Sequence, residues 1–131
     1  MFLDANIFLC SIFTRSKEGE DCRNLLKRIA RGEQNAAISP LVMDEAMHVL
    51  IPKRGLGFAI RFMRSILENP GIKVLAVEER VLNRLPTYLE QGMEPRDAMH
   101  AATMRVYSIS TICTFDRGFD NKKGIKRQGP K

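Results

Sequence analysis

The chain has 131 residues, of which 44% are hydrophobic and 27% are charged, and these ordinary values predict one globular domain over residues 1–131. No apolar run approaches the roughly 18 residues of a membrane span, and the N-terminus lacks the basic and apolar regions of an export signal, so we expect a cytoplasmic protein with no membrane partner. The net charge of +6 favours a polyanionic partner, because Lys and Arg gain free energy by displacing counterions from phosphates.

Short apolar runs alternate with amphipathic segments in the first half of the chain. Apolar residues between Cys22 and Ile29 recur at helical spacing. Ser39 and Pro40 form a helix start, with Ser at the cap and Pro at the first helical position, and Pro52 is expected to end that helix. In chain order we expect a strand at Met1–Asp4, helices at Ala5–Phe13 and Glu18–Arg31, a strand at Ala36–Ser39, and a helix from Pro40 to Ile51.

The second half continues this alternation. Pro86 is expected to break a helix late or to start it anew, and Glu94 with Pro95 begins another helix. In chain order we expect a helix at Leu56–Leu67, a strand at Lys73–Val77, a helix at Glu79–Leu89, a helix from Pro95 to Tyr107, a strand at Ser110–Phe115 and a short edge strand at Gly124–Gln128. Strands separated by helices predict an α/β fold, in which a central parallel sheet of four to five strands is covered on both faces.

Five carboxylates lie where predicted strands end or predicted helices begin. They are Asp4, Glu45, Asp97, Asp116 and Asp120. The carboxyl ends of parallel strands meet at one edge of a sheet, where ligands bind in such folds, so we expect the acids to converge there. Clustered carboxylates repel each other unless a cation neutralises them, and oxygen ligands suit Mg²⁺ or Mn²⁺. The sequence therefore predicts a divalent metal site.

Four of these acids also have a purely structural interpretation. Asp4 is placed to cap a helix, and Asp97 is placed to stabilise the N-terminus of a buried helix through the helix dipole. Asp116 and Asp120 frame a turn that either of them would cap. Both interpretations stay open for each of these residues when it is taken alone.

Glu45 has the weakest structural alternative. Helical spacing aligns it with Leu41 and Val49 on the apolar stripe, whereas Asp44 falls on the polar side toward His48. A carboxylate within an apolar stripe is costly unless it is paired or binds a metal. We therefore choose Glu45 over its neighbour as the metal ligand.

Cysteine and histidine are expected to play no part in this metal site. Cys10, Cys22 and Cys113 lie in apolar or helical patterns and are interpreted as reduced structural thiols. His100 follows Asp97 by three residues on the same helix, but we expect it to pack structurally, because a two-metal mechanism does not need it as a base.

A cation held by carboxylates normally acts on phosphates, and in a basic protein this indicates nucleic acid as the substrate. Arg117, Lys122 and Lys123 follow the last predicted strand and are expected to contact the nucleic-acid backbone. The alternative is that these residues belong to a solvated C-terminal segment that only keeps the protein soluble.

Four segments of the chain resemble the motifs of a known family. They are Met1–Asn6 (MFLDAN), Ser39–Glu45, Glu94–Ala102 (EPRDAMHAA) and Thr114–Asp120 (TFDRGFD). In order and spacing they resemble the motifs of PIN domains, and in particular the single-domain VapC toxins of toxin–antitoxin pairs. The resemblance covers essentially the whole chain.

This resemblance implies a three-layer α/β/α fold and a Mg²⁺- or Mn²⁺-dependent endoribonuclease that acts on RNA. It gives catalytic metal-ligand roles to Asp4, Glu45, Asp97 and Asp116, and an accessory acidic role to Asp120. Asn6 and Thr114 match polar positions that assist these acids. The resemblance also implies a homodimer, and an antitoxin protein whose C-terminal segment covers the active-site groove.

Two other functions remain open. One is a catalytically silent PIN fold that binds nucleic acid or protein, although every acidic position is filled. The other is a different Mg²⁺-dependent phosphoryl-transfer enzyme, such as a phosphatase or a receiver domain. Such proteins usually need a second acid two residues after the nucleophilic Asp, where this chain has Asn6, or a Lys at a late strand exit, and no Lys lies near Asp116.

Overall fold

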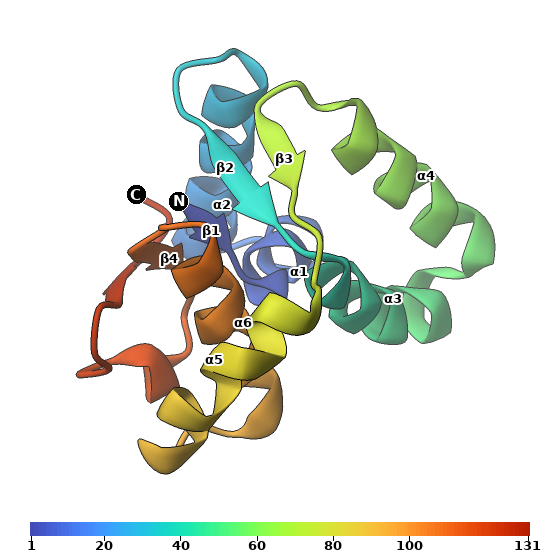
Figure 1. Cartoon of the computed structure of the whole chain (residues 1–131). Coiled ribbons are helices and arrows are strands. Elements are labelled where there is room, and N and C mark those ends of the chain that lie inside the picture. The colour runs from blue at the N-terminus through green and yellow to red at the C-terminus, as the bar shows by residue number, and fades with distance from the viewer.

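The computed structural model describes all residues from 1 to 131 and contains one five-stranded sheet in which every strand pair is parallel (Figure 1). The strand order is β3-β2-β1-β4-β5. The chain builds outward from the central strand β1 (Phe2–Leu3) to one edge and then, after β3, crosses to the other side of β1. The strand order therefore reverses beside β1, which makes the carboxyl end of β1 the expected place for a ligand site.

The helices and strands alternate as the sequence predicted. The remaining strands are β2 (Ala36–Ile38), β3 (Ile72–Val74), β4 (Thr111–Cys113) and β5 (Lys126–Gln128). The helices are α1 (Ala5–Phe13), α2 (Lys17–Ala30), α3 (Pro40–Arg54), α4 (Leu56–Glu68), α5 (Glu79–Glu90), α6 (Pro95–Val106) and the short 3-10 helix η1 (Arg117–Phe119).

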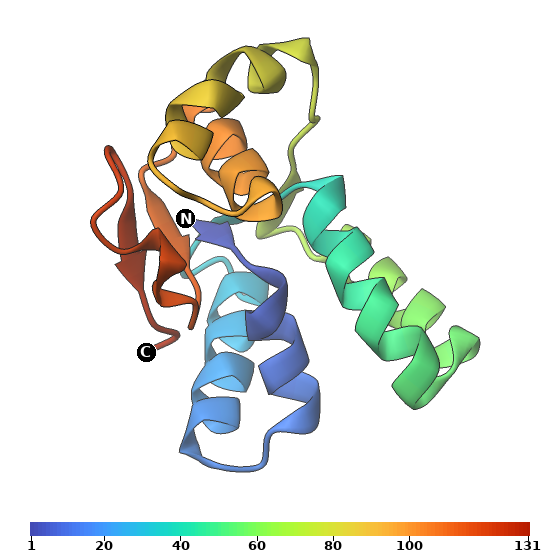
Figure 2. The ribbon, with the colours of Figure 1, turned by 90° about the horizontal axis from the view of Figure 1, so that it is seen from below.

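Helices cover both faces of the sheet, which confirms the predicted three-layer α/β/α architecture. Figure 2 shows α1 and α2 on one side of the sheet and α5 and α6 on the other. Helices α3 and α4 form a hairpin that extends away from the sheet. None of the helices is both long and apolar enough to span a membrane.

The core lies between the sheet and these helices. Phe2 and Leu3 of β1 and Ile112 and Cys113 of β4 are completely buried. Such continuous burial is expected of a central parallel strand, which is covered on both faces. The two strands carry the residues that follow them, Asp4 and Thr114, to the same edge of the sheet.

Two predictions about proline were wrong. Helix α3 continues through Pro52 to Arg54, and α5 continues through Pro86. Proline removes one backbone hydrogen bond from a helix, but packing on both sides of the gap compensates for this loss. In α5 the side chains of Val81 and Tyr88, on either side of Pro86, are both buried.

The predicted strand at Lys73–Val77 was too long, since β3 ends at Val74. Ser39 does precede α3 as its cap residue, but its side chain makes no capping hydrogen bond. Its hydroxyl is buried without a partner. The proline at the first helical position fixes the start of α3 in its place.

Candidate active site

Asp4 is held at the carboxyl end of β1 by two kinds of contact. Its Oδ1 accepts a hydrogen bond from the backbone N–H of Ala5 at 2.8 Å, so Asp4 caps α1. Its Oδ2 accepts a hydrogen bond from the Thr114 hydroxyl at 2.7 Å. The side chain is buried, and this burial raises the pKa of its carboxyl, while the bond from Thr114 opposes the rise. The capping interpretation therefore holds for Asp4, whose carboxylate also lies within 4.8 Å of ligand atoms of Glu45 and His100.

Asn6 and Thr114 join the exits of β1 and β4. The Asn6 amide donates to the Thr114 hydroxyl oxygen at 2.9 Å, and the backbone N–H of Asp116 donates to the same oxygen at 3.0 Å. Thr114 in turn donates to Asp4. One hydroxyl therefore fixes the positions of two acids relative to each other, which is a supporting contact of the kind that orients metal ligands.

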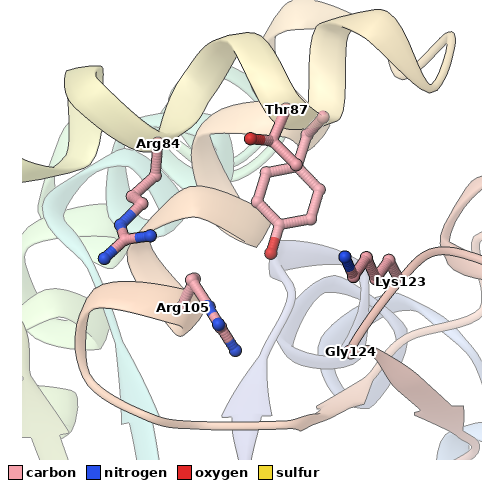
Figure 3. A pocket seen from close by; sticks show the side chains of 6 residues that line it. Arg84, Thr87, Arg105, Lys123 and Gly124 are labelled. Atoms are coloured by element: carbon pink, nitrogen blue, oxygen red, sulfur yellow. The ribbon is translucent and has the colours of Figure 1, made fainter.

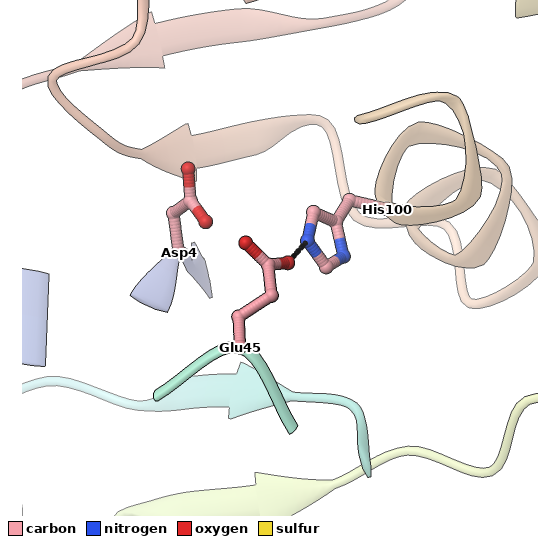
Figure 4. A group of neighbouring side chains, drawn as sticks. All are labelled: Asp4, Glu45 and His100. Atoms are coloured by element: carbon pink, nitrogen blue, oxygen red, sulfur yellow. Dashed lines mark hydrogen bonds and ion pairs between the residues drawn. The ribbon is translucent and has the colours of Figure 1, made fainter. Parts of the chain in front are cut away.

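Glu45 reaches the same edge from α3, as Figure 4 shows. Its Oε1 lies 2.5 Å from Nε2 of His100, which comes from α6. Ligand atoms of Asp4, Glu45 and His100 all lie within 4.8 Å of one another. Asp44 lies exposed beside His48, with 3.4 Å between His48 Nδ1 and Asp44 Oδ1, as the helical spacing predicted.

The expectation that no histidine takes part in the site was wrong. His100 is completely buried and packs against the ring of Phe2, with 5.6 Å between ring centroids, but it also contacts the Glu45 carboxylate. The signal in the sequence was its spacing, because a residue three positions after Asp97 lies on the same helical face.

Asp97 and Asp116 form the second pair of acids. Asp97 lies in the first turn of α6, and Asp116 follows β4 and caps η1 by accepting the Gly118 N–H at 2.8 Å. Burial, followed by repulsion from Asp116 and Asp4 and a hydrogen bond with Asp116, raises the pKa of Asp97 to about 7. Burial is the largest cause of this shift, and the contributions of Asp116 and Asp4 show that the three carboxyls lie close together.

This donor set fits a divalent cation. Asp4, Glu45 and His100 each place one ligand atom within 4.8 Å of the others, and Asp97 lies close enough to Asp116 and Asp4 for both to raise its pKa. Oxygen-rich sites with at most one imidazole suit Mg²⁺ or Mn²⁺. A cation among these groups would relieve the repulsion that raises the pKa of Asp97.

Asp120 has a different partner. Its two carboxylate oxygens accept hydrogen bonds from Nε and Nη2 of Arg127 at 2.6 and 3.2 Å. The bond from Arg127 lowers the pKa of Asp120. The same guanidinium donates to the backbone carbonyl of Thr114 at 3.3 Å. Asp120 thus supports the β4 exit through Arg127, and its accessory metal role stays a prediction.

The basic residues expected to contact nucleic acid lie around this edge and beyond it. Arg117 is exposed in η1, next to Asp116. The Lys122 ammonium donates to the backbone carbonyl of Gln91 at 3.3 Å, which ties the loop before β5 to the end of α5. Lys123 is exposed and lines a pocket beside α5.

Known proteins resemble this chain over nearly its whole length. The PIN domain family model matches residues 1–125. The VapC ribonuclease Mb1869c of Mycobacterium bovis and ribonuclease VapC13 of Mycobacterium tuberculosis are each 29% identical over 133 residues, which cover 97% of this chain and 98% of theirs.

Solved structures share the same fold. VapBC2 from Rickettsia felis, bound to a DNA fragment from its promoter, superposes with a TM-score of 0.74 at 17% identity, covering 98% of this chain and 96% of that one. FitAB bound to the IR36 DNA fragment superposes with a TM-score of 0.73 at 21% identity, covering 98% of this chain and 94% of that one. At these identities, the likeness establishes the fold alone.

Proposed function

The chain belongs to the PIN-domain family, and from this premise we propose that it is a metal-dependent endoribonuclease that hydrolyses RNA phosphodiester bonds. The observation that carries the proposal is the meeting of acids from β1, α3, α6 and the β4 exit at one edge of the sheet. The names of the two curated relatives, both ribonucleases, support RNA as the substrate.

Asp4, Glu45, Asp97 and Asp116 are the proposed metal ligands. A divalent ion, Mg²⁺ or Mn²⁺, would supply Lewis acidity toward the phosphodiester and a more acidic water as the nucleophile. Both carboxylate oxygens of Asp4 accept hydrogen bonds, Oδ1 from the Ala5 backbone and Oδ2 from Thr114, and the remaining lone pairs of the carboxylate would bind the ion. Glu45 contributes the oxygen that faces Asp4 in Figure 4, since its other oxygen is held by His100.

The surrounding residues orient this set. Hydrogen bonds through Thr114 and Asn6 fix the position of Asp4 relative to the Asp116 backbone, and His100 contacts the Glu45 carboxylate. We call the place where Asp4, Glu45, Asp97 and Asp116 meet the acidic edge. Arg117 lies next to Asp116 and is proposed to attract the phosphate backbone of RNA to this edge.

The proposed biological role is that of the toxin in a toxin–antitoxin pair, acting as a homodimer in the cytoplasm. Proteins with the same fold support an antitoxin partner, since they include a toxin–antitoxin complex from Klebsiella pneumoniae and DNA-bound VapBC from Salmonella typhimurium. The partner is proposed to cover the acidic edge and so to block access of RNA.

The test is cleavage of single-stranded RNA by the purified chain in Mn²⁺, compared with Asp97→Asn. We expect cleavage by the wild type only, because the substitution removes a charged ligand. Asp44→Asn removes the same charge from the exposed side of α3 and is the matched control. An Asp97→Asn protein that cleaves as fast as the wild type contradicts the site, and RNA binding without any cleavage by the wild type indicates the silent binding fold instead.

A further inference from the structure

A second cluster of like charges lies on the flank formed by α5, α6 and the loop before β5. We call it the basic flank, and its residues are Arg80, Arg84, Arg105 and Lys123. All four are exposed, and none of them forms an ion pair with an acid. Nothing in the catalytic site uses them.

Two adjoining pockets on this flank are built around the same two arginines. The first, of about 380 Å³, is lined by Arg84, Arg105 and Lys123, together with Thr87 and Tyr88 (Figure 3). The second, of about 670 Å³, is lined by Arg80, Arg84, Arg105, Asn83 and Ser108. Neither pocket has an acidic residue in its lining. Every charge that faces these pockets is therefore positive.

Part of the basic flank is held in place before any ligand binds. The Arg80 guanidinium stacks over the Tyr107 ring at 5.6 Å from its centroid. The Tyr107 hydroxyl donates to the carbonyl of Ala76 at 2.9 Å, which fixes the ring. Tyr88 is buried and contributes to the lining of the first pocket.

We propose that the basic flank is a phosphate-binding exosite, which holds the RNA backbone beside the catalytic acids. The positively charged side chains that line the first pocket come from three separate segments, α5, α6 and the loop before β5. A single bound anion can therefore accept hydrogen bonds from several directions. This suits a phosphate better than a carboxylate, which offers only two oxygens. Two adjoining pockets with shared arginines suit the repeated charges of a nucleic-acid strand.

The position of the flank fits a strand that also reaches the catalytic edge. Asp97 and Arg105 lie in the first and last turns of the same helix, α6. Eight residues of helix correspond to about 12 Å at 1.5 Å per residue. That distance corresponds to a few nucleotides of RNA, so one molecule can contact both ends of α6.

The proposal rests on RNA being the substrate, and its test separates the two claims. Binding of a single-stranded RNA is measured at several salt concentrations in the full chain carrying Asp97→Asn, so that no cleavage intervenes. Two variants are made in this background. The flank variant carries Arg84→Ala and Arg105→Ala, and the control variant carries Arg61→Ala and Arg64→Ala. Arg61 and Arg64 are exposed on α4, so the control loses the same charge at a distance from the flank.

The flank variant is expected to bind RNA roughly tenfold more weakly, and the slope of log affinity against log salt is expected to fall by about 1.4, since each lost phosphate contact on a single strand accounts for about 0.7. The control variant is expected to keep the parental slope. With the wild-type acids, the flank substitutions should raise KM for cleavage, and this rise should shrink as the RNA is shortened.

Equal slopes for the two variants would overturn the exosite even if the wild type cleaves RNA normally. An absence of Mn²⁺-dependent cleavage by the wild type, with the slopes still different, would instead count against the proposed enzyme. Binding of polyglutamate to the same two variants is measured as well. If the flank variant bound RNA like its parent but bound polyglutamate more weakly, the flank would be assigned to an acidic protein partner, and RNA would be rejected. Circular dichroism of both variants checks that the fold is kept.

Discussion

The two ends of α6 carry opposite clusters of like charge, and the clusters are built differently. At its N-terminal end, Asp97 is partly buried, and the neighbouring Asp116 contributes to raising its pKa. At its C-terminal end, Arg105 is exposed, and it lines its pockets with Arg84 without touching an acid. Both charges suit the dipole of the helix at their own end, so the helix tolerates each cluster.

Because the acidic cluster is partly buried and the basic cluster is exposed, we expect the two clusters to act through different physical effects. Carboxylates that are partly buried and close together interact strongly, so a single cation at short range has a large effect on them. Exposed arginines interact weakly with one another and act through the release of counterions from a strand. We therefore expect changes at the acidic edge to act on metal binding and chemistry, and changes on the basic flank to act on RNA affinity and its salt dependence.

Asp4 offers the strongest test of this division, because it combines a proposed ligand with a helix cap. Asp4→Asn and Asp4→Ala are both expected to reduce Mn²⁺-dependent cleavage by more than about a hundredfold, the upper range for a residue that only supports a ligand. Asp4→Ala should also lower the free energy of unfolding by about 1 kcal/mol more than Asp4→Asn, because Asn still caps a helix. Cleavage rates and urea melts measure the two effects.

The same pair of variants shows how the division could fail. If Asp4→Asn cleaves RNA well and only Asp4→Ala is impaired, Asp4 is a structural cap and the acidic edge lacks its central ligand. The salt dependence of RNA binding should be almost the same in both, since neither substitution touches the basic flank.

His100 tests whether contacts behind the acids set their affinity for the metal. His100→Leu keeps an apolar side chain beside Phe2 but removes the donor to Glu45, and Mn²⁺ binding is expected to weaken by roughly 10–100-fold. His100→Gln retains an N–H donor and should recover part of this loss. Calorimetric titration with Mn²⁺ measures both variants. Unchanged Mn²⁺ affinity in His100→Leu, with only thermal stability lowered, would reduce His100 to a packing residue.

The raised pKa of Asp97 gives the acidic edge a pH signature that the basic flank lacks. Because the pKa is about 7 in the folded chain and about 3.9 in an unfolded one, the folded state holds this proton more tightly. Without metal, ionisation of Asp97 therefore lowers stability as the pH rises from about 4 to about 7. Asp97→Asn removes this loss, so in EDTA it should melt at a higher temperature than the wild type at about pH 8, with a smaller gap at about pH 5.

Added Mn²⁺ should reverse that order at about pH 8, since only the wild type has the full set of charged ligands to gain from the ion. Thermal melts in EDTA and in Mn²⁺ provide the measurement. If the difference in melting temperature between the two proteins in EDTA were the same at both pH values, the pKa of Asp97 would not be raised in the folded chain.

The fold could be predicted from the sequence, because the features that indicate its helices and strands depend on residues close together in the chain. Strand exits at Asp4 and Asp116, the start of α3 at Pro40 and the choice of Glu45 over Asp44 each follow from spacing within a few residues. Parallel pairing then brings such exits to one edge without further information. This is why Asp4, Glu45, Asp97 and Asp116 could be expected to lie near one another, while their role as metal ligands stays a prediction.

What the sequence missed depends on contacts between distant residues. Pro86 remains inside α5 because buried neighbours on both sides hold the helix, and no local rule contains that packing. His100 meets Glu45 across 55 positions of sequence. The arginines of the basic flank come from α5 and α6, and neither forms a recognisable motif. In each case the partner is chosen by the fold.

Asp120→Asn is expected to have the smallest effect, and it tests where the acidic edge ends. The Asp120–Arg127 pair is exposed to solvent, which screens it, so its loss should lower the free energy of unfolding only slightly. Cleavage should fall only a fewfold, because Arg127 supports the Thr114 carbonyl and the β4 exit from outside the ligand set. Arg127→Gln should have a similar effect on both quantities, since it breaks the same contact. If Asp120→Asn instead abolished cleavage while Arg127→Gln did not, Asp120 would act on the metal directly, and the acidic edge would contain five ligands rather than four.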